Sequence, residues 1–125
     1  MAKAKLKKIL WLSGLQEHDY PAAESYLGLI YSEAQVQKMI TRLRRTPVVH
    51  FEAKDIFRAS QLSALGVSNS HVEKDREKIR ERQGLSPLLL VRDEPNGKVV
   101  IADGYHRLCA VYEFDEDAVI PCKII

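Results

Sequence analysis

The stretch from residue 99 to residue 112 constrains the fold more than any other part of this chain. Four apolar residues, 99–102, favour a buried strand, and Asp103-Gly104 breaks it. Apolar positions at Leu108 and at 110–112 then follow the pattern of a short amphipathic helix. A strand that turns through glycine into a helix directs backbone N–H groups and the positive end of the helix dipole at one point. This segment therefore predicts a site for a phosphate or a carboxylate.

Side chains in the first turn of the predicted helix fit the same interpretation. Arg107 opposes the helix dipole unless an anion is near, so it binds a ligand or forms a salt bridge with Asp103 or another acid. His106 is a phosphate donor or a general base, or it only hydrogen-bonds the turn. Asp103 holds a metal or accepts a substrate proton, or it is only a helix cap or a turn residue. Tyr105 is a lid or stacking group, or an ordinary half-exposed aromatic residue.

The bulk composition is that of an ordinary soluble protein. At 125 residues with 46% hydrophobic residues, we expect one domain with a substantial core. Cys109 and Cys122 form no CxxC pair, which favours buried thiols and a cytoplasmic location. The apolar run 9–12 is too short for a signal peptide or a membrane span, so we expect no membrane partner.

The net charge of +2 gives no strong field over the whole molecule, although the positive charge is clustered. These clusters are either solvated segments or the surface for a nucleic-acid or acidic partner. They consist of Lys3, Lys5, Lys7 and Lys8, and of Arg42, Arg44 and Arg45.

Residues 1–46 are predicted to form a helical pair. Pro21 suits the first turn of one helix, and Ser32 begins the next with capping-box spacing to Gln35. Pro47 ends that second helix. The preceding run 9–12 is either a short strand or an apolar segment that lies across the core.

Two further elements are predicted before residue 85. Residues 48–51 suggest a strand, whereas 54–65 show no clear period. A second capping box at 70–73 opens a charged helix, 71–83, and Gly84 is a reasonable stop. The anchors expected in the ambiguous segment are Ile56, Leu62 and Leu65.

The last part of the chain reads as three strands around the helix of the first paragraph. Strands at 87–92 and 98–102 pair around Asn96-Gly97, a strong hairpin signal. Residues 120–125 form a final strand, in which Pro121 suggests an edge position.

This order of elements over about residues 47–125, with the Asp-Gly-Tyr-His-Arg turn, resembles the ParB/sulfiredoxin superfamily. In that superfamily a Gly-x-[His/Arg]-Arg motif at a strand-to-helix turn binds nucleotide phosphates, and Gly104, His106 and Arg107 match it. The resemblance implies an α+β (mixed α/β) fold, a small mixed sheet flanked by helices, with residues 1–46 as an N-terminal helical addition to a single domain, 1–125.

Asp103 before the glycine resembles the Asp-Gly-His-His-Arg variant of ParB-like small-molecule kinases, including free-serine kinases. The implied ligand is a nucleotide (ATP, ADP or CTP) with Mg²⁺, or another phosphorylated small molecule, and phosphotransfer or phosphate hydrolysis could follow. Sulfiredoxins place a catalytic cysteine where this chain has Tyr105, so we do not expect sulfinic-acid reduction. Because no helix-turn-helix segment follows in this sequence, we do not expect centromere partitioning.

The resemblance also implies a set of site residues. The loop that ends in Ser70-His71 borders the nucleotide site in this superfamily, although a simple helix cap is the alternative. Residues 52–55 follow the first matched strand and could reach the same cleft. The candidate catalytic residues are Asp103, His106 and Glu52. The candidate ligand-binding residues are Gly104, Tyr105, His106, Arg107, Lys54, Ser70 and His71.

Phosphotransfer makes a geometric demand that a structure can test. At least one of Glu52 and Asp55 must share a cavity with Asp103 and His106 to supply a base. The alternatives are a nucleotide sensor or a protein- or DNA-interaction module without catalysis, and a homodimer stays open. A two-metal nuclease is less favoured, because no carboxylate cluster and no metal-ligand spacing is evident.

Overall fold

The computed structural model describes residues 9–63 and 69–125, so predictions for Lys3, Lys5, Lys7, Lys8 and Leu65 lie outside the described residues. Its helices are α2 (Asp19–Leu27), α3 (Glu33–Arg45), α4 (Ala53–Ser60), α5 (Ser70–Arg80) and α6 (Tyr105–Phe114). Its strands are β1 (Val49–Glu52), β2 (Leu88–Asp93), β3 (Lys98–Asp103) and β4 (Val119–Ile124), with a 3₁₀ turn at Glu94–Asn96.

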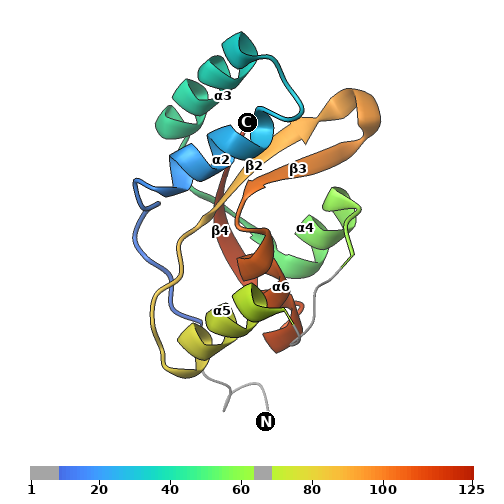
Figure 1. Cartoon of the computed structure of the whole chain (residues 1–125). Coiled ribbons are helices and arrows are strands. Elements are labelled where there is room, and N and C mark those ends of the chain that lie inside the picture. Colours follow the sequence, from blue (N-terminus) through green and yellow to red (C-terminus); the bar gives the residue numbers. More distant parts are fainter. Residues whose placement is uncertain (1–8, 64–68) are drawn as a thin grey trace.

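The four described strands form one mixed sheet in the order β1-β4-β2-β3. β1 and β4 are antiparallel, β2 and β3 are antiparallel, and β2 and β4 are parallel. The predicted α+β class, with a small mixed sheet and flanking helices, is confirmed (Figure 1).

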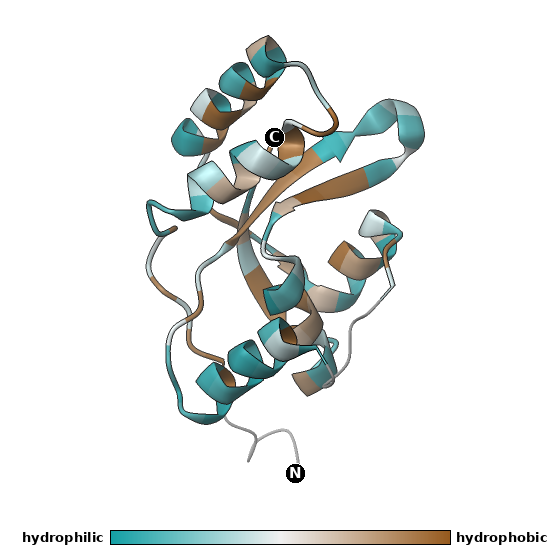
Figure 2. Ribbon diagram, in the orientation of Figure 1, coloured by the Kyte–Doolittle hydropathy of each residue, from teal (hydrophilic) through white to brown (hydrophobic). Residues whose placement is uncertain are grey.

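Helices cover both faces of this sheet. Because both faces of β2 are therefore buried, the strand has a continuous run of apolar residues rather than an alternating pattern. Leu88 and Leu90 pack in a core with residues of α4, α5 and α6, whereas Leu89 and Val91 pack in a second core with residues of α2 and α3. Figure 2 shows the inner strands in hydrophobic colours between the two helical layers. Successive residues of the strand therefore serve opposite cores.

The N-terminal helical pair is confirmed. The Ser32 hydroxyl accepts a hydrogen bond from the Gln35 N–H at 3.3 Å, and the Gln35 side chain accepts one from the Ser32 N–H at 3.1 Å, which completes the predicted capping box. The run 9–12 lies across the core: Trp11 forms an isolated bridge with Leu85, and the Leu12 N–H donates to the Leu85 carbonyl at 2.8 Å. None of the helices in the described ranges has the length and apolarity to cross a membrane.

The ambiguous segment after β1 is helical as far as Ser60. Ile56 is buried in α4, as predicted, but Leu62 is 44% exposed and is not a core anchor. The helix ends at Gln61, which adopts a left-handed conformation, so the chain leaves the core before residue 62. Both cysteines are buried, as predicted, and burial raises the pKa of Cys122 to about 11.

The predicted capping box at 70–73 is wrong by one residue. Asn69 caps α5, and its side chain accepts hydrogen bonds from the N–H groups of His71 and Val72 at 3.0 and 3.2 Å. Asn and Ser are both good cap residues, and here the asparagine occupies the extended position that a cap requires. The helix also ends at Arg80 rather than near Gly84.

The final strand is not at an edge, contrary to the prediction from Pro121. β4 lies between β1 and β2. Its parallel ladder with β2 begins at Cys122, one residue after the proline, so Pro121 lies outside the part that is paired on both sides. The β2–β3 hairpin is confirmed, although a 3₁₀ turn with Gly97 at φ 63° closes it.

Candidate anion-binding site

The predicted strand-to-helix turn is confirmed and depends on one glycine. Asp103 ends β3, Gly104 is the N-cap of α6 with φ 108°, and the helix begins at Tyr105. A Cβ atom on Gly104 would lie 2.7 Å from Leu88 Cγ and 2.9 Å from a guanidinium nitrogen of Arg107. Both the backbone conformation and the close packing therefore favour glycine here.

The turn opens onto a cavity of about 290 Å³ between α5 and the start of α6, as the sequence predicted. The two helices pack against each other (Figure 1), and polar side chains from both line the cavity. Because the first N–H groups of a helix have no intrahelical acceptor, the start of α6 adds donors to this region. The cavity is lined by His71, Lys74, Asp75, Lys78, Asp103, Gly104, His106 and Arg107.

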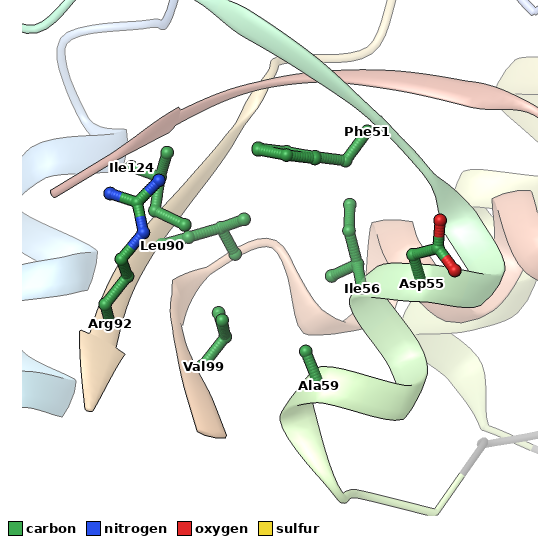
Figure 3. Close-up of a pocket in the computed structure, with 8 residues that line it drawn as sticks. All are labelled: Phe51, Asp55, Ile56, Ala59, Leu90, Arg92, Val99 and Ile124. Carbon is green, nitrogen blue, oxygen red and sulfur yellow. The ribbon is translucent and has the colours of Figure 1, made fainter. Parts of the chain in front are cut away.

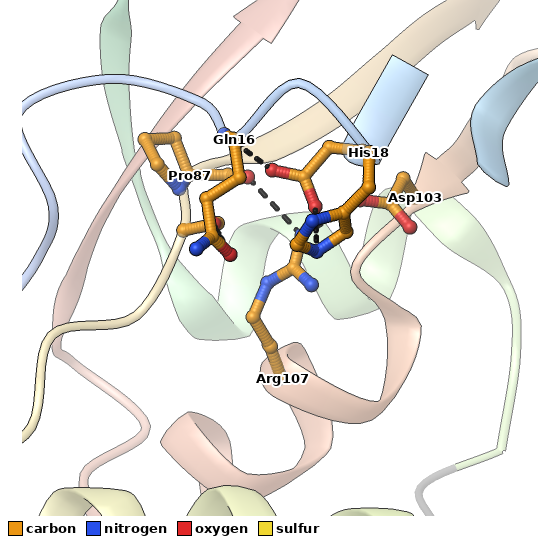
Figure 4. A network of polar contacts seen from close by, with 7 residues as sticks. Gln16, His18, Pro87, Asp103 and Arg107 are labelled. Carbon is orange, nitrogen blue, oxygen red and sulfur yellow. Dashed lines mark hydrogen bonds and ion pairs between the residues drawn. The ribbon is translucent and has the colours of Figure 1, made fainter. Parts of the chain in front are cut away.

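Arg107 is partly engaged within the protein. Its Nη2 lies 2.9 Å from Asp103 Oδ2 and donates to the Pro87 carbonyl at 3.2 Å, so the salt bridge that the sequence left open is formed (Figure 4). The two side chains are only 16% and 15% exposed. The Nε atom of Arg107 is buried and has no hydrogen-bond partner within the described residues. The guanidinium is thus fixed in place with an unused donor.

A second carboxylate stands behind Asp103. Asp19, at the start of α2, is 2% exposed and accepts a hydrogen bond from the Gln16 N–H at 2.8 Å. Burial raises the pKa of Asp103, the Arg107 guanidinium opposes that rise, and Asp19 adds to it. The N-terminal helical layer therefore contacts the site through this acidic pair, although the resemblance placed it outside the matched region.

The two histidines of the cavity face each other from different helices. The rings of His71 and His106 lie 4.8 Å apart between centroids. Burial is the main cause that lowers the pKa of His106 from its ordinary value, and His71 lowers it further, while Asp75 opposes both. His106 is therefore neutral at pH 7 and gains charge at lower pH.

Helix α5 supplies three lining residues that the sequence analysis did not single out: Lys74, Asp75 and Lys78. Asp75 lies three residues after Val72 and four before Ile79, the two buried residues of this helix. Its helical spacing therefore places it beside the apolar seam, a signal that was available in the sequence. Burial raises the pKa of the Asp75 carboxyl, and Arg107 is the foremost group that opposes the rise.

Several predicted site residues lie elsewhere. Lys54 forms an ion pair with Asp117 at 2.6 Å, and Asp55 lines a different cavity. Neither Glu52 nor Ser70 lines the anion-binding cavity, where Ser70 was expected beside His71.

Tyr105 also turns away from this cavity, because its hydroxyl donates to the Ser63 carbonyl. The condition that phosphotransfer requires, a cavity shared by Glu52 or Asp55 with Asp103 and His106, is not met. Glu52 ends β1 and Asp55 lies in α4, which packs on the sheet and on α6, and neither residue lines the cavity between α5 and α6.

No family model, curated protein or solved structure matches the chain. The function is therefore argued from the site itself. In the described part of the chain, no three His, Cys, Asp or Glu side chains are placed together to hold a metal ion.

Proposed function

We propose that the cavity between α5 and α6 binds the phosphate of a small molecule, with a nucleotide as the preferred class, as the likeness to the ParB/sulfiredoxin superfamily implies. The observation that carries the proposal is the convergence of Arg107, Lys74, Lys78 and two histidines on one cavity at a helix N-terminus. The three cations Arg107, Lys74 and Lys78 outnumber the two lining carboxylates Asp75 and Asp103, so the cavity favours an anion.

The partners of Arg107 indicate how a phosphate would be held. Asp103 and the Pro87 carbonyl fix the guanidinium through Nη2, so that its side chain is oriented before a ligand arrives. Lys74 and Lys78 extend from the facing helix as mobile point charges. If Mg²⁺ accompanies the phosphate, Asp75 and Asp103 are the carboxylates at hand, since this ion is often held by one or two carboxylates plus phosphate oxygens.

The site supports binding better than phosphotransfer. The bases that the sequence offered, Glu52 and Asp55, do not border the cavity. Burial raises the pKa of Asp103, but its carboxylate is occupied by the ion pair with Arg107 and is not free to contact a substrate hydroxyl. We therefore propose a binding or sensing role for this site and assign no chemical step to it.

The first test is the variant Arg107→Ala. A thermal-shift panel of nucleoside di- and triphosphates, with and without Mg²⁺, identifies the best ligand, since a ligand of the native state raises its stability. We expect Arg107→Ala to weaken that ligand by about 10- to 150-fold in calorimetry, the value of a charge-assisted hydrogen bond. The matched control is Arg58→Ala, an exposed arginine of α4 outside the cavity.

The contradicting result of this test is equal affinity of Arg107→Ala and the wild-type protein. Because the variant leaves the buried Asp103 without its cation, far-UV circular dichroism must show that it is folded. A panel in which no nucleotide raises the melting temperature would remove the preference for nucleotides.

The second test is the pH dependence of sulfate binding. The pKa of His106 is lowered from 6.5, so that His106 gains its charge only as the pH falls through that lowered value. Sulfate keeps its charge over this range, and we expect its affinity to rise by about tenfold between about pH 7.5 and about pH 5.5. The pKa of Asp75 is raised, and its protonation at the low-pH end of this range removes a negative charge from the cavity, which also increases the affinity for sulfate.

Two histidine variants distinguish the source of this pH dependence. His106→Gln should flatten the profile, whereas His50→Gln, an exposed residue of β1, should leave it unchanged. A profile in His106→Gln as steep as that of the wild-type protein would show that another group controls the charge of the cavity.

A further inference from the structure

A second cavity lies on the sheet face that α4 covers only in part. It has a volume of about 240 Å³ and shares no lining residue with the anion-binding cavity. Figure 3 shows it between α4 and the strands, with Phe51 on one side and Val99 on the opposite side. It is lined by Phe51, Asp55, Ile56, Ala59, Leu90, Arg92, Val99 and Ile124.

Six of these eight lining residues are apolar. Phe51 is 38% exposed although its strand belongs to the sheet, so part of its ring is left without a protein partner. A concave apolar surface with a few polar groups at its margin is the usual form of a small-molecule site, because the ligand gains from leaving water there.

Two charged residues stand at opposite sides of this apolar surface, Arg92 from β2 and Asp55 from α4 (Figure 3). Neither forms an ion pair or a side-chain hydrogen bond with another residue in the described ranges. A guanidinium can bind a carboxylate through two parallel hydrogen bonds, and a carboxylate at the far side repels an anion placed there. A ligand with one carboxylate is therefore expected to bind in one orientation, with its carboxylate at Arg92 and away from Asp55.

We propose that this second cavity binds a small monocarboxylate with an apolar body. The carboxylate binds Arg92, and the apolar body lies between Phe51, Leu90 and Val99. The volume equals that of about eight water molecules at about 30 Å³ each, which sets the size of the ligand at a short aliphatic or single-ring acid. This proposal is independent of the anion-binding cavity and of any nucleotide.

The test compares three probes of equal chain length: hexanoate, 1-hexanol and hexylamine. Methyl NMR of the wild-type protein follows Ile56, Leu90 and Ile124, with the exposed Leu29 as a reference outside the cavity. We expect hexanoate to shift the three cavity methyl signals at a concentration about tenfold or more below that needed for hexanol. Hexylamine can bind in the reverse direction through Asp55, but it should bind less tightly than hexanoate, because only the guanidinium of Arg92 offers two parallel hydrogen bonds.

Variants separate the charge from the apolar surface. Arg92→Gln should bring hexanoate to the level of hexanol, whereas Arg58→Gln, on the exposed side of α4, should keep the preference. Ala59→Leu should block both probes by filling the cavity, and Val99→Phe should do so from β3 if the first variant does not fold. Circular dichroism verifies the fold of each variant.

Three results would overturn the proposal. The first is the absence of any probe-induced shift at the cavity methyl groups. The second is hexanol or hexylamine binding as well as hexanoate in the wild-type protein, which would indicate a general apolar surface, such as one for a protein partner. The third is a preference for hexanoate that survives Arg92→Gln.

Discussion

Replacing Gly104 with alanine is expected to lower the free energy of unfolding by about 2–6 kcal/mol and to abolish binding in the anion-binding cavity. A residue with a Cβ atom at φ 108° is strained by roughly 1–3 kcal/mol. The added carbon would also lie 2.7 Å from Leu88 Cγ, and overpacking of a core costs about 1–3 kcal/mol more. To avoid this contact the backbone of the turn must shift, and this shift displaces Arg107 from the cavity.

The matched control for this variant is Gly97→Ala. Gly97 also has a positive φ, 63°, but nothing lies within 4 Å of the position that its Cβ would take. We expect a loss of about 1–2 kcal/mol there, from the backbone alone, and unchanged ligand binding. Urea unfolding and calorimetry measure both quantities. Equal losses of stability in the two variants would show that the contact with Leu88 costs nothing.

Leu43→Ala is expected to lower the free energy of unfolding by about 2–5 kcal/mol, the usual cost of a leucine removed from a core. Leu43 is fully buried in α3 and belongs to the core that includes Leu89 and Val100 of the sheet. The N-terminal helices thus cover a sheet face that would otherwise be exposed to water.

The control for Leu43→Ala is Leu29→Ala, because Leu29 is 84% exposed and its loss should change stability by less than about 0.5 kcal/mol. Urea unfolding at one protein concentration compares the two. A small effect of Leu43→Ala would mean that packing of the N-terminal helices on the sheet contributes little to the stability of the protein.

Local signals in the sequence predicted local structure well. The Ser32–Gln35 capping box, the hairpin and the strand-to-helix turn at Gly104 each depend on residues a few positions apart. These features therefore form through local interactions that do not depend on the tertiary arrangement of the chain.

Features that depend on distant residues were not predicted. Pro121 indicated an edge, but the position of β4 is decided by its pairing with β1 and β2. Lys54 was assigned to the ligand, whereas its partner is Asp117, 63 residues away. Lys74 and Lys78 were missed because nothing in α5 itself shows that α6 lies beside it.

The strand order has a consequence for how this protein folds as it is made. β4 follows every other described strand in the sequence, yet it lies inside the sheet and joins β1 to the β2–β3 hairpin. Until β4 emerges from the ribosome, β1 has no strand partner and the hairpin keeps an unpaired edge. The sheet must therefore close after synthesis of this region, through pairings of long sequence separation, and such closure is slow and exposes apolar strands to aggregation meanwhile.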